Sequence, residues 1–108
     1  MSGKYNIVAK QGATYNLNFT VETDGVPWDL TTYTFAMQVR RSTASTTTLL
    51  NLTSATMNAS GEVSVTVLAA TMNGVPAGRW VYDIELTIGT TVTRILEGRF
   101  IVTPQVTQ

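Results

Sequence analysis

Hydrophobic residues fall at every second position along the most regular stretch of this chain, residues 80–88. The apolar positions are Trp80, Tyr82, Ile84, Leu86 and Ile88. Side chains of a β-strand point to opposite faces in turn, so this pattern predicts a long strand with one buried face. Because this face carries two large aromatic residues, we expect the core to be built on it.

The same alternation recurs along the rest of the chain and predicts further strands, separated by turn signals such as Asp24-Gly25. A short extended piece at residues 26–28 contains proline, which lacks a ladder donor and therefore belongs at an edge or a strand switch. The other expected strands are residues 5–9, 14–22, 33–41, 49–53, 62–68 and 92–102.

Only one short stretch is compatible with a helix. Residues 69–73 form about one turn, which Gly74 and Pro76 end. Parallel strands need long crossover connections, and the pattern contains none. We therefore predict an all-β fold, an antiparallel sandwich or barrel of about seven strands, in a single domain covering residues 1–108.

The register of the last hairpin is open between several pairings. A two-residue turn at Gly89-Thr90 places Tyr82 opposite Glu97, which is a poor pair for a core. A three-residue loop places Tyr82 opposite Gly98 instead. A β-bulge at Gly98 would combine the two-residue turn with an inward-facing Phe100. We favour the three-residue loop or the bulge over a regular two-residue hairpin.

Composition narrows the possible functions. The 108 residues include seven basic and seven acidic ones, so the formal net charge is zero and no field steers the protein toward nucleic acid or an anionic membrane. Charged residues make up only 13% of the chain, and threonine is the most frequent residue. A neutral surface of this kind is poorly defended against association, which suggests that much of it meets other protein.

Cysteine and histidine are both absent, which excludes disulfides, thiolate metal sites and the commonest general base. No apolar run has the length of a signal peptide or a membrane span. We therefore expect no cofactor, no metal and no membrane partner, and a protein made in a cytoplasm or assembled there into something larger.

The remaining polar and aromatic clusters favour structural roles. Asp83 and Glu85 fall on the outer face of their strand, where a solvated set with Arg94 or Arg99 is expected rather than a hydrolytic pair. Asp24 and Asp29 sit in turns, where they bond the local backbone, and a calcium site between them would need further oxygens. Arg40-Arg41 is the only basic pair and is read as a solvated strand end rather than a nucleic-acid patch.

Three segments together resemble a known family. The first runs from Gln11-Gly12-Ala13-Thr14-Tyr15 to Asp24-Gly25-Val26-Pro27 and Asp29-Leu30-Thr31-x-Tyr33-x-Phe35. The second is Gly74-Val75-Pro76-Ala77-Gly78-Arg79-Trp80-Val81-Tyr82-Asp83-Ile84-Glu85, and the third is Leu96-Glu97-Gly98-x-Phe100-x-Val102-x-Pro104. This pattern resembles the immunoglobulin-like module of tailed-phage virion proteins, such as the N-terminal domain of the baseplate upper protein family.

The resemblance implies an immunoglobulin-like antiparallel β-sandwich without enzymatic activity, used in several copies, or as a homo-oligomer, to mount other virion proteins. The expected location is the virion, assembled in the cytoplasm of the bacterial host. This chain differs from the baseplate protein in that its 108 residues contain no pattern of a coiled-coil or fibre-binding region. Its station is therefore open between the baseplate, the neck, a fibre adaptor and a capsid decoration.

Several residues are candidates for contact with a partner. The strand at residues 5–9 and the C-terminal segment from Val102 to Val106 are expected edge strands, whose unpaired backbone groups can dock another chain. The alternative function is recognition of host-surface glycan through exposed aromatic residues beside turns. The candidate interface residues are Tyr5, Ile7, Trp28, Tyr33, Val102 and Val106.

Tyr82 has a second expected role. It sits where an immunoglobulin-like fold places a corner tyrosine, near the start of the penultimate strand after a one-turn helix. We predict that its hydroxyl bonds the backbone between Ala69 and Gly74.

Overall fold

The computed structural model describes residues 3–45 and 47–104, and it is almost entirely β-structure. The elements are β1 (Gly3–Lys4), β2 (Ile7–Lys10), β3 (Tyr15–Thr20), β4 (Glu22–Thr23), β5 (Val26–Pro27), β6 (Thr34–Arg40), β7 (Thr48–Leu52), β8 (Thr56–Met57), β9 (Glu62–Val67), α1 (Ala69–Asn73), β10 (Gly78–Ile88) and β11 (Thr91–Thr103).

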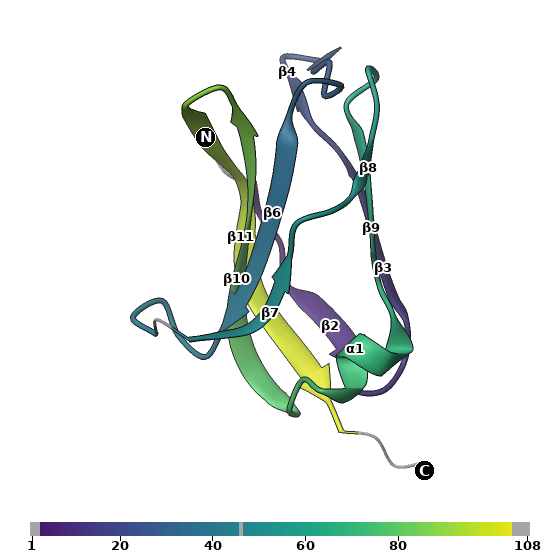
Figure 1. The fold of residues 1–108 in the computed structure, drawn as a ribbon, viewed down its shortest axis with the longest axis vertical. Helices are drawn as coiled ribbons and strands as arrows, with labels where there is room; N and C mark the ends of the chain where they lie inside the picture. The colour runs from purple at the N-terminus through teal and green to yellow at the C-terminus, as the bar shows by residue number, and fades with distance from the viewer. Residues whose placement is uncertain (1–2, 46, 105–108) are drawn as a thin grey trace.

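Two sheets face each other and enclose the core (Figure 1). One is six-stranded, with the order β1-β11-β10-β6-β7 and with β2 also paired to β11. The other has the order β3-β9-β8, and β4 and β5 form a separate small hairpin. The helix α1 connects β9 of the three-stranded sheet to β10 of the six-stranded sheet. It lies at one end of the molecule (Figure 1). The all-β prediction is therefore confirmed, and so is the position of the one-turn helix.

The core follows from the alternation in the sequence. The six-stranded sheet contributes residues such as Val39, Ile84 and Phe100, which are fully buried. The three-stranded sheet contributes Val63 and Val65. Each of these lies at the inward position of a strand whose neighbouring residues are more exposed, as the period of two predicts.

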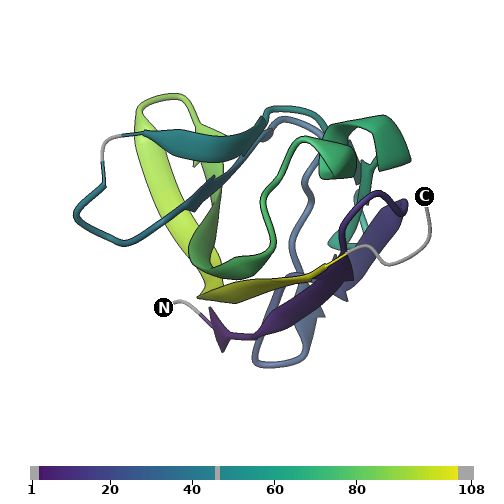
Figure 2. The ribbon, with the colours of Figure 1, turned by 90° about the horizontal axis from the view of Figure 1, so that it is seen from below.

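The prediction that all strands run antiparallel is wrong for the start of the chain. β1 and β2 run parallel to β11, with Gly3 opposite Leu96 and Ile7 opposite Phe100. Figure 2 shows β2 and β11 side by side. Parallel strands need a long connection between them. Here the connection from β2 to β11 is nearly the whole chain, so this requirement is satisfied. The six-stranded sheet is therefore mixed, whereas the three-stranded sheet is antiparallel.

The last hairpin combines features of the pairings expected from the sequence. Ile88 pairs with Thr91, so the turn has two residues. A register shift follows between Ile84 and Glu85, and beyond it Tyr82 lies opposite Gly98. The expected bulge exists, but it lies opposite this step rather than at Gly98. The bulge leaves one residue of β11 unpaired. Beyond it, the strands pair as expected for a three-residue loop, with Tyr82 opposite Gly98, although the turn itself has two residues.

Candidate functional site

Trp28 and Tyr33 lie together at the end of the molecule that carries the small β4–β5 hairpin. Their ring centroids are 5.9 Å apart with an interplanar angle of 35°. The Trp28 Nε1–H donates to Thr23 Oγ1 at 2.9 Å, which fixes the indole ring. Both rings are half-buried against the core. Both rings therefore keep part of their surface in contact with solvent.

Asp29 supports the turn between these two rings. Its Oδ1 accepts hydrogen bonds from the Thr31 backbone N–H at 3.1 Å and from Thr31 Oγ1 at 2.7 Å. These bonds favour the charged carboxylate and lower the pKa of Asp29 below its ordinary value. The expected local turn role of Asp29 is confirmed, and it leaves Leu30 buried beneath the turn.

The other candidate interface residues differ in their exposure. The Tyr5 side chain is 51% exposed, whereas those of Ile7 and Val102 are 1% and 2% exposed and belong to the core. Val102 pairs with Gly78 on one side and with Ala9 on the other, so the expectation of an edge strand at Val102 is wrong. A partner at this edge could therefore contact the backbone of Ile7. It could not contact the buried side chains of Ile7 and Val102, but it could contact the more exposed residues next to them in the sequence.

Of the expected edge strand at residues 5–9, residues 7–9 do lie in an edge strand, because β2 pairs only with β11 among the described strands. Tyr5 and Asn6 form the connection between β1 and β2. Val8 points outward from this edge and is 60% exposed. Val106 lies outside the described residues, so its expected place in the interface stays a prediction.

Tyr82 holds the first strands of the chain rather than the region of α1. Its hydroxyl donates to the carbonyl oxygen of Tyr5 at 2.5 Å, and the Tyr5 N–H donates to the carbonyl of Glu97 at 2.9 Å. The predicted bond to the backbone between Ala69 and Gly74 is therefore wrong. Gly98 lies opposite Tyr82, and a Cβ there would overlap the carbonyl oxygen of Tyr5. Because glycine has no side chain, the Tyr5 carbonyl can lie close enough to Gly98 for the Tyr82 hydroxyl to donate to it.

Burial changes the acidity of this tyrosine. Removal from water raises the pKa of Tyr82 well above its ordinary value, and the neighbouring Tyr15 and Tyr5 raise it further. The hydroxyl therefore stays protonated and remains a donor over the whole physiological range. This chemistry is suited to fixing a strand and not to acid–base catalysis near neutral pH.

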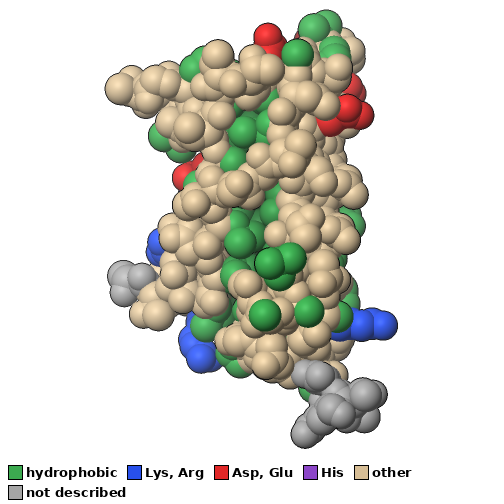
Figure 3. Space-filling view, turned by 45° about the vertical axis from the view of Figure 1, so that its right-hand side comes forward, with side chains coloured by type: hydrophobic (Ala, Val, Ile, Leu, Met, Phe, Trp, Pro, Cys, Tyr) green, Lys and Arg blue, Asp and Glu red, His purple; other side chains and the backbone are tan. Residues whose placement is uncertain are grey.

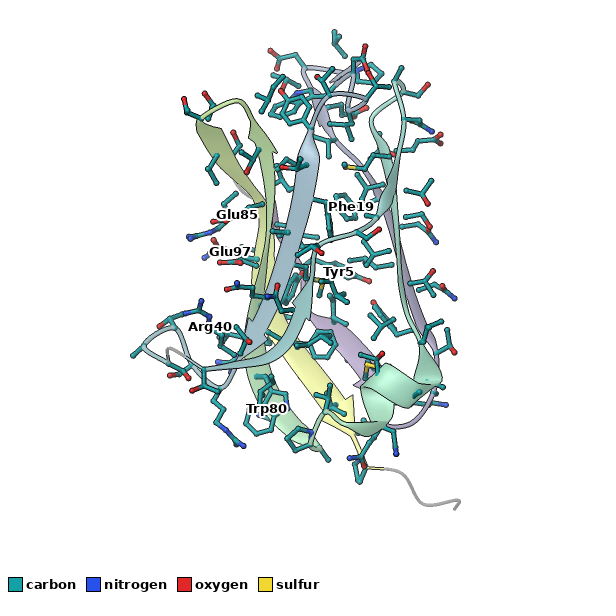
Figure 4. The ribbon with its side chains drawn as sticks, viewed as in Figure 1. Tyr5, Phe19, Arg40, Trp80, Glu85 and Glu97 are labelled. Carbon is teal, nitrogen blue, oxygen red and sulfur yellow. The ribbon has the colours of Figure 1, made fainter. Side chains whose placement is uncertain are left out.

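The outer face of the six-stranded sheet carries a solvated charge cluster. Arg94 lies 3.4 Å from Asp83, 3.7 Å from Glu85 and 3.8 Å from Glu97, measured between side-chain nitrogen and oxygen atoms. Figure 4 shows Glu85 and Glu97 pointing away from the space between the sheets. The expected outer-face set with Arg94 is confirmed. Since these side chains are one-third to one-half exposed, their ion pairs contribute little to stability.

This cluster lines a shallow groove of about 700 Å³ on the same face. Half of the chain's fourteen charged residues line it, namely Lys4, Arg40, Asp83, Glu85, Arg94, Glu97 and Arg99. Arg40 is tied within the groove, because its guanidinium donates to Gln38 Oε1 at 2.6 Å and to the Ser45 carbonyl at 2.9 Å. Acids and bases are mixed here, so the groove presents no single sign of charge to a ligand.

The opposite side of the molecule is nearly uncharged. We call it the neutral side and define it as β7, β8, β9 and α1. These elements and their connections span residues 48–73, and Glu62 is the only charged residue among them. In Figure 3, hydrophobic side chains follow the seam between the two sheets, and the charged side chains in view lie at the margins. The charges of this protein are therefore distributed unequally between its two faces.

A row of half-buried apolar residues borders this seam. Leu52 ends β7, Ala55 lies in the connection to β8, and Met57 lies in β8. Beside them is a hollow of about 470 Å³, lined by residues 51–56 with Ser64 and Thr66. The sequence pattern placed a strand here, but it did not identify the strand as an edge. The long uncharged run is the signal that could have drawn attention to it.

Among residues 3–45 and 47–104, no group of three or more acidic, cysteine or histidine side chains is placed to hold a metal ion. Within the same residues, no helix is long and apolar enough to cross a membrane. Comparison of the chain with protein-family models gives no match, and comparison with curated protein sequences gives no significant match either.

Proposed function

We propose that this chain is an immunoglobulin-like β-sandwich that acts as a non-enzymatic structural component of a tailed-phage virion. It serves as a docking or adaptor module on the tail, baseplate or fibre, or as a decoration protein on the capsid. Its partners are other virion proteins, which it meets in several copies. The virion assignment rests on the three segments that resemble the phage module.

The observation that carries the fold part of the proposal is the order of strands. The sequence β11-β10-β6-β7 in one sheet and β3-β9-β8 in the other has the order G-F-C-C′ and B-E-D of an immunoglobulin fold. The helix α1 then lies in the E–F connection, directly before the strand that carries Tyr82. The tyrosine hydroxyl binds the first strands instead of this connection, which is a local departure from the expected corner.

The surface supports a role in assembly. Protein interfaces are depleted of charged residues at their centres, and the neutral side has one charged residue, Glu62, in 26 positions (48–73). The exposed Leu68 adds an apolar contact point on this side, next to α1. A surface of this composition is better suited to permanent contact with another protein than to full exposure to solvent.

The proposal is tested by the composition of purified particles. We expect the protein to co-purify with intact particles in a fixed copy number that is a multiple of a virion symmetry. Quantitative mass spectrometry of density-purified particles measures this number. Absence of the protein from particles that are otherwise complete would contradict a structural role.

A second candidate function is binding of a host-surface glycan by Trp28 and Tyr33. The two half-buried rings lie 5.9 Å apart, and the bond to Thr23 fixes the Trp28 ring, so that a sugar ring could stack on this pair. On a glycan array, this function predicts binding that is lost in Trp28→Ala and kept in Tyr5→Ala, whose ring is exposed elsewhere. An array on which the wild-type protein binds no glycan would contradict it.

A further inference from the structure

The strand β7 is a free edge of the six-stranded sheet. Among the described strands it pairs only with β6, with Leu50 opposite Val39 and Leu52 opposite Met37. Among the described residues, no backbone hydrogen bond outside the strand ladders involves residues 48–52, so nothing else covers this edge. The outward N–H and C=O groups of β7 are therefore available to a further strand.

The two edges of this sheet are protected differently. The opposite edge, formed by β1 and β2, carries Lys4 and Lys10, and charges of this kind discourage pairing with another chain. β7 has no charged residue, and the uncharged run around it extends from residue 42 to residue 61. One irregularity breaks the ladder between Val39 and Arg40, but it lies at the start of β7 and leaves residues 50–52 regular.

An added strand would also cover apolar surface. The seam beside β7 exposes parts of Leu52, Ala55 and Met57, and the hollow of about 470 Å³ lies next to them. A strand hydrogen-bonded to β7 would continue the six-stranded sheet over this seam. Its inward side chains would meet the hollow, and its outward side chains would meet solvent.

We propose that β7 of a second copy of this chain is the strand that occupies this edge. A charged segment would lose hydration here without gaining a counter-ion, so the occupant has to be uncharged. It also has to alternate between inward apolar and outward polar residues. Residues 50–52 of β7 meet both conditions, because Leu50 is buried, Asn51 is exposed and Leu52 is half-buried.

Twofold symmetry fixes the pairing. Two identical strands related by a closed twofold axis run antiparallel, and one residue lies opposite itself. With Asn51 at the axis, Leu50 of each copy faces Leu52 of the other on the inner side. The two Asn51 side chains then face each other on the outer side, where their amides can exchange hydrogen bonds. The product is one continuous sheet that passes through both copies.

The pairing should be weak in isolation. A contact through one strand of five residues buries less than the roughly 1,000 Å² of a stable interface, so we expect a dimer that depends on concentration. Attachment of several copies to one particle would raise their effective concentration and strengthen it. The inference thus names one partner for the proposed structural role.

The test is sedimentation equilibrium of the purified full chain from about 10 μM to about 1 mM, together with Asn51→Lys and Asn18→Lys. We expect the wild-type mass to rise from 11.7 kDa toward twice that value. Asn51→Lys puts like charges opposite each other and should weaken the dimer roughly fivefold or more. Asn18→Lys, an exposed asparagine on β3 at the edge of the other sheet, should associate as the wild type does.

A charge-complementation experiment tests the register. Asn51→Glu alone should associate as weakly as Asn51→Lys, and an equimolar mixture of the two should recover the dimer, since opposite charges then meet at the axis. A wild-type protein that stays monomeric at all concentrations would overturn the inference, and so would a mixture no stronger than either variant. Far-ultraviolet circular dichroism confirms that each variant is folded.

Failure of this inference and failure of the proposed function are distinguishable. Self-association is measured on purified protein, whereas the structural role is measured by the presence of the protein in particles. A monomeric protein that is present in particles removes the β7 pairing and keeps the role. A dimer that is absent from particles does the reverse.

Discussion

Gly98 is the residue that allows the first strands of the chain to join the sheet. A Cβ at this position would overlap the carbonyl oxygen of Tyr5 and approach Asn6 Oδ1. The same two residues hold the strand in place, since the Tyr5 carbonyl accepts from Tyr82 and Asn6 Oδ1 accepts from the Arg99 N–H at 3.1 Å. Loss of the close approach at Gly98 would therefore disturb both bonds.

This close approach predicts a large effect of a single methyl group. We expect Gly98→Ala to lower the free energy of unfolding by about 1–3 kcal/mol, because the parallel strand must move away. Gly3→Ala is the matched control, since its Cβ would meet only ordinary contacts with Leu96 and Ile95. Urea denaturation measures both. Equal stability of the two variants would show that the strand is not held at Gly98.

Tyr82 predicts a dependence of stability on alkaline pH. Burial raises its pKa in the folded state, so the folded protein keeps this proton more firmly than the unfolded chain does. The resulting stability is fully present below the unfolded pKa near 10 and is lost as pH rises above that value. We expect the unfolding free energy to fall above about pH 10 in the wild type and to fall less steeply in Tyr82→Phe.

The same substitution also tests the hydrogen bond itself. At neutral pH, Tyr82→Phe leaves the Tyr5 carbonyl without this donor and should cost about 0.5–1.5 kcal/mol. Tyr15→Phe is the control, because no described residue accepts a hydrogen bond from the Tyr15 hydroxyl, although burial raises its pKa as well. A neutral-pH cost that is the same in both variants would contradict the anchoring role of Tyr82.

The sequence predicts residue roles well where the partners are local. Asp29 bonds a residue two positions away, and turn chemistry alone identifies that role. Tyr82 bonds a residue 77 positions away, and nothing in its neighbourhood indicates that partner. The expected corner bond rests on an analogy with immunoglobulin folds, whereas the acceptor in the structure is Tyr5, in the connection between β1 and β2.

At the scale of elements, alternation places most strands correctly. The expected strands at 33–41, 62–68 and 80–88 coincide closely with β6, β9 and β10. Periodicity succeeds here because each strand has one face on the core, so its register is encoded in its own residues. Periodicity does not show which strand lies beside which, so it predicts neither the parallel pairing of β2 with β11 nor the free edge at β7.

The last hairpin shows how element-level conflicts are resolved. The sequence allows a tight turn at Gly89-Thr90 but favours Tyr82 opposite Gly98, and these two pairings differ in register by one residue. The structure satisfies both because one residue of β11 opposite the Ile84–Glu85 step is left out of the ladder. A conflict of register in a sequence can therefore be taken as a prediction of a bulge, although not of its position.

At the scale of the whole molecule, the unequal distribution of charge is the main functional signal. The outer face of the six-stranded sheet carries half of the charged residues, whereas residues 42–78 carry Glu62 alone. The net charge of zero conceals this division. A molecule built in this way has one face suited to water and one suited to neighbours, which agrees with a role in an assembly.

Imaging of intact particles by cryo-electron microscopy tests this account most directly. We expect ordered density that fits the two facing sheets in several symmetry-related positions, with the neutral side (β7, β8, β9 and α1) against a neighbouring protein and the Arg94 cluster toward solvent. Particles without such density would contradict the structural role. Density in which the neutral side faces solvent in every copy would contradict the use of this side in assembly.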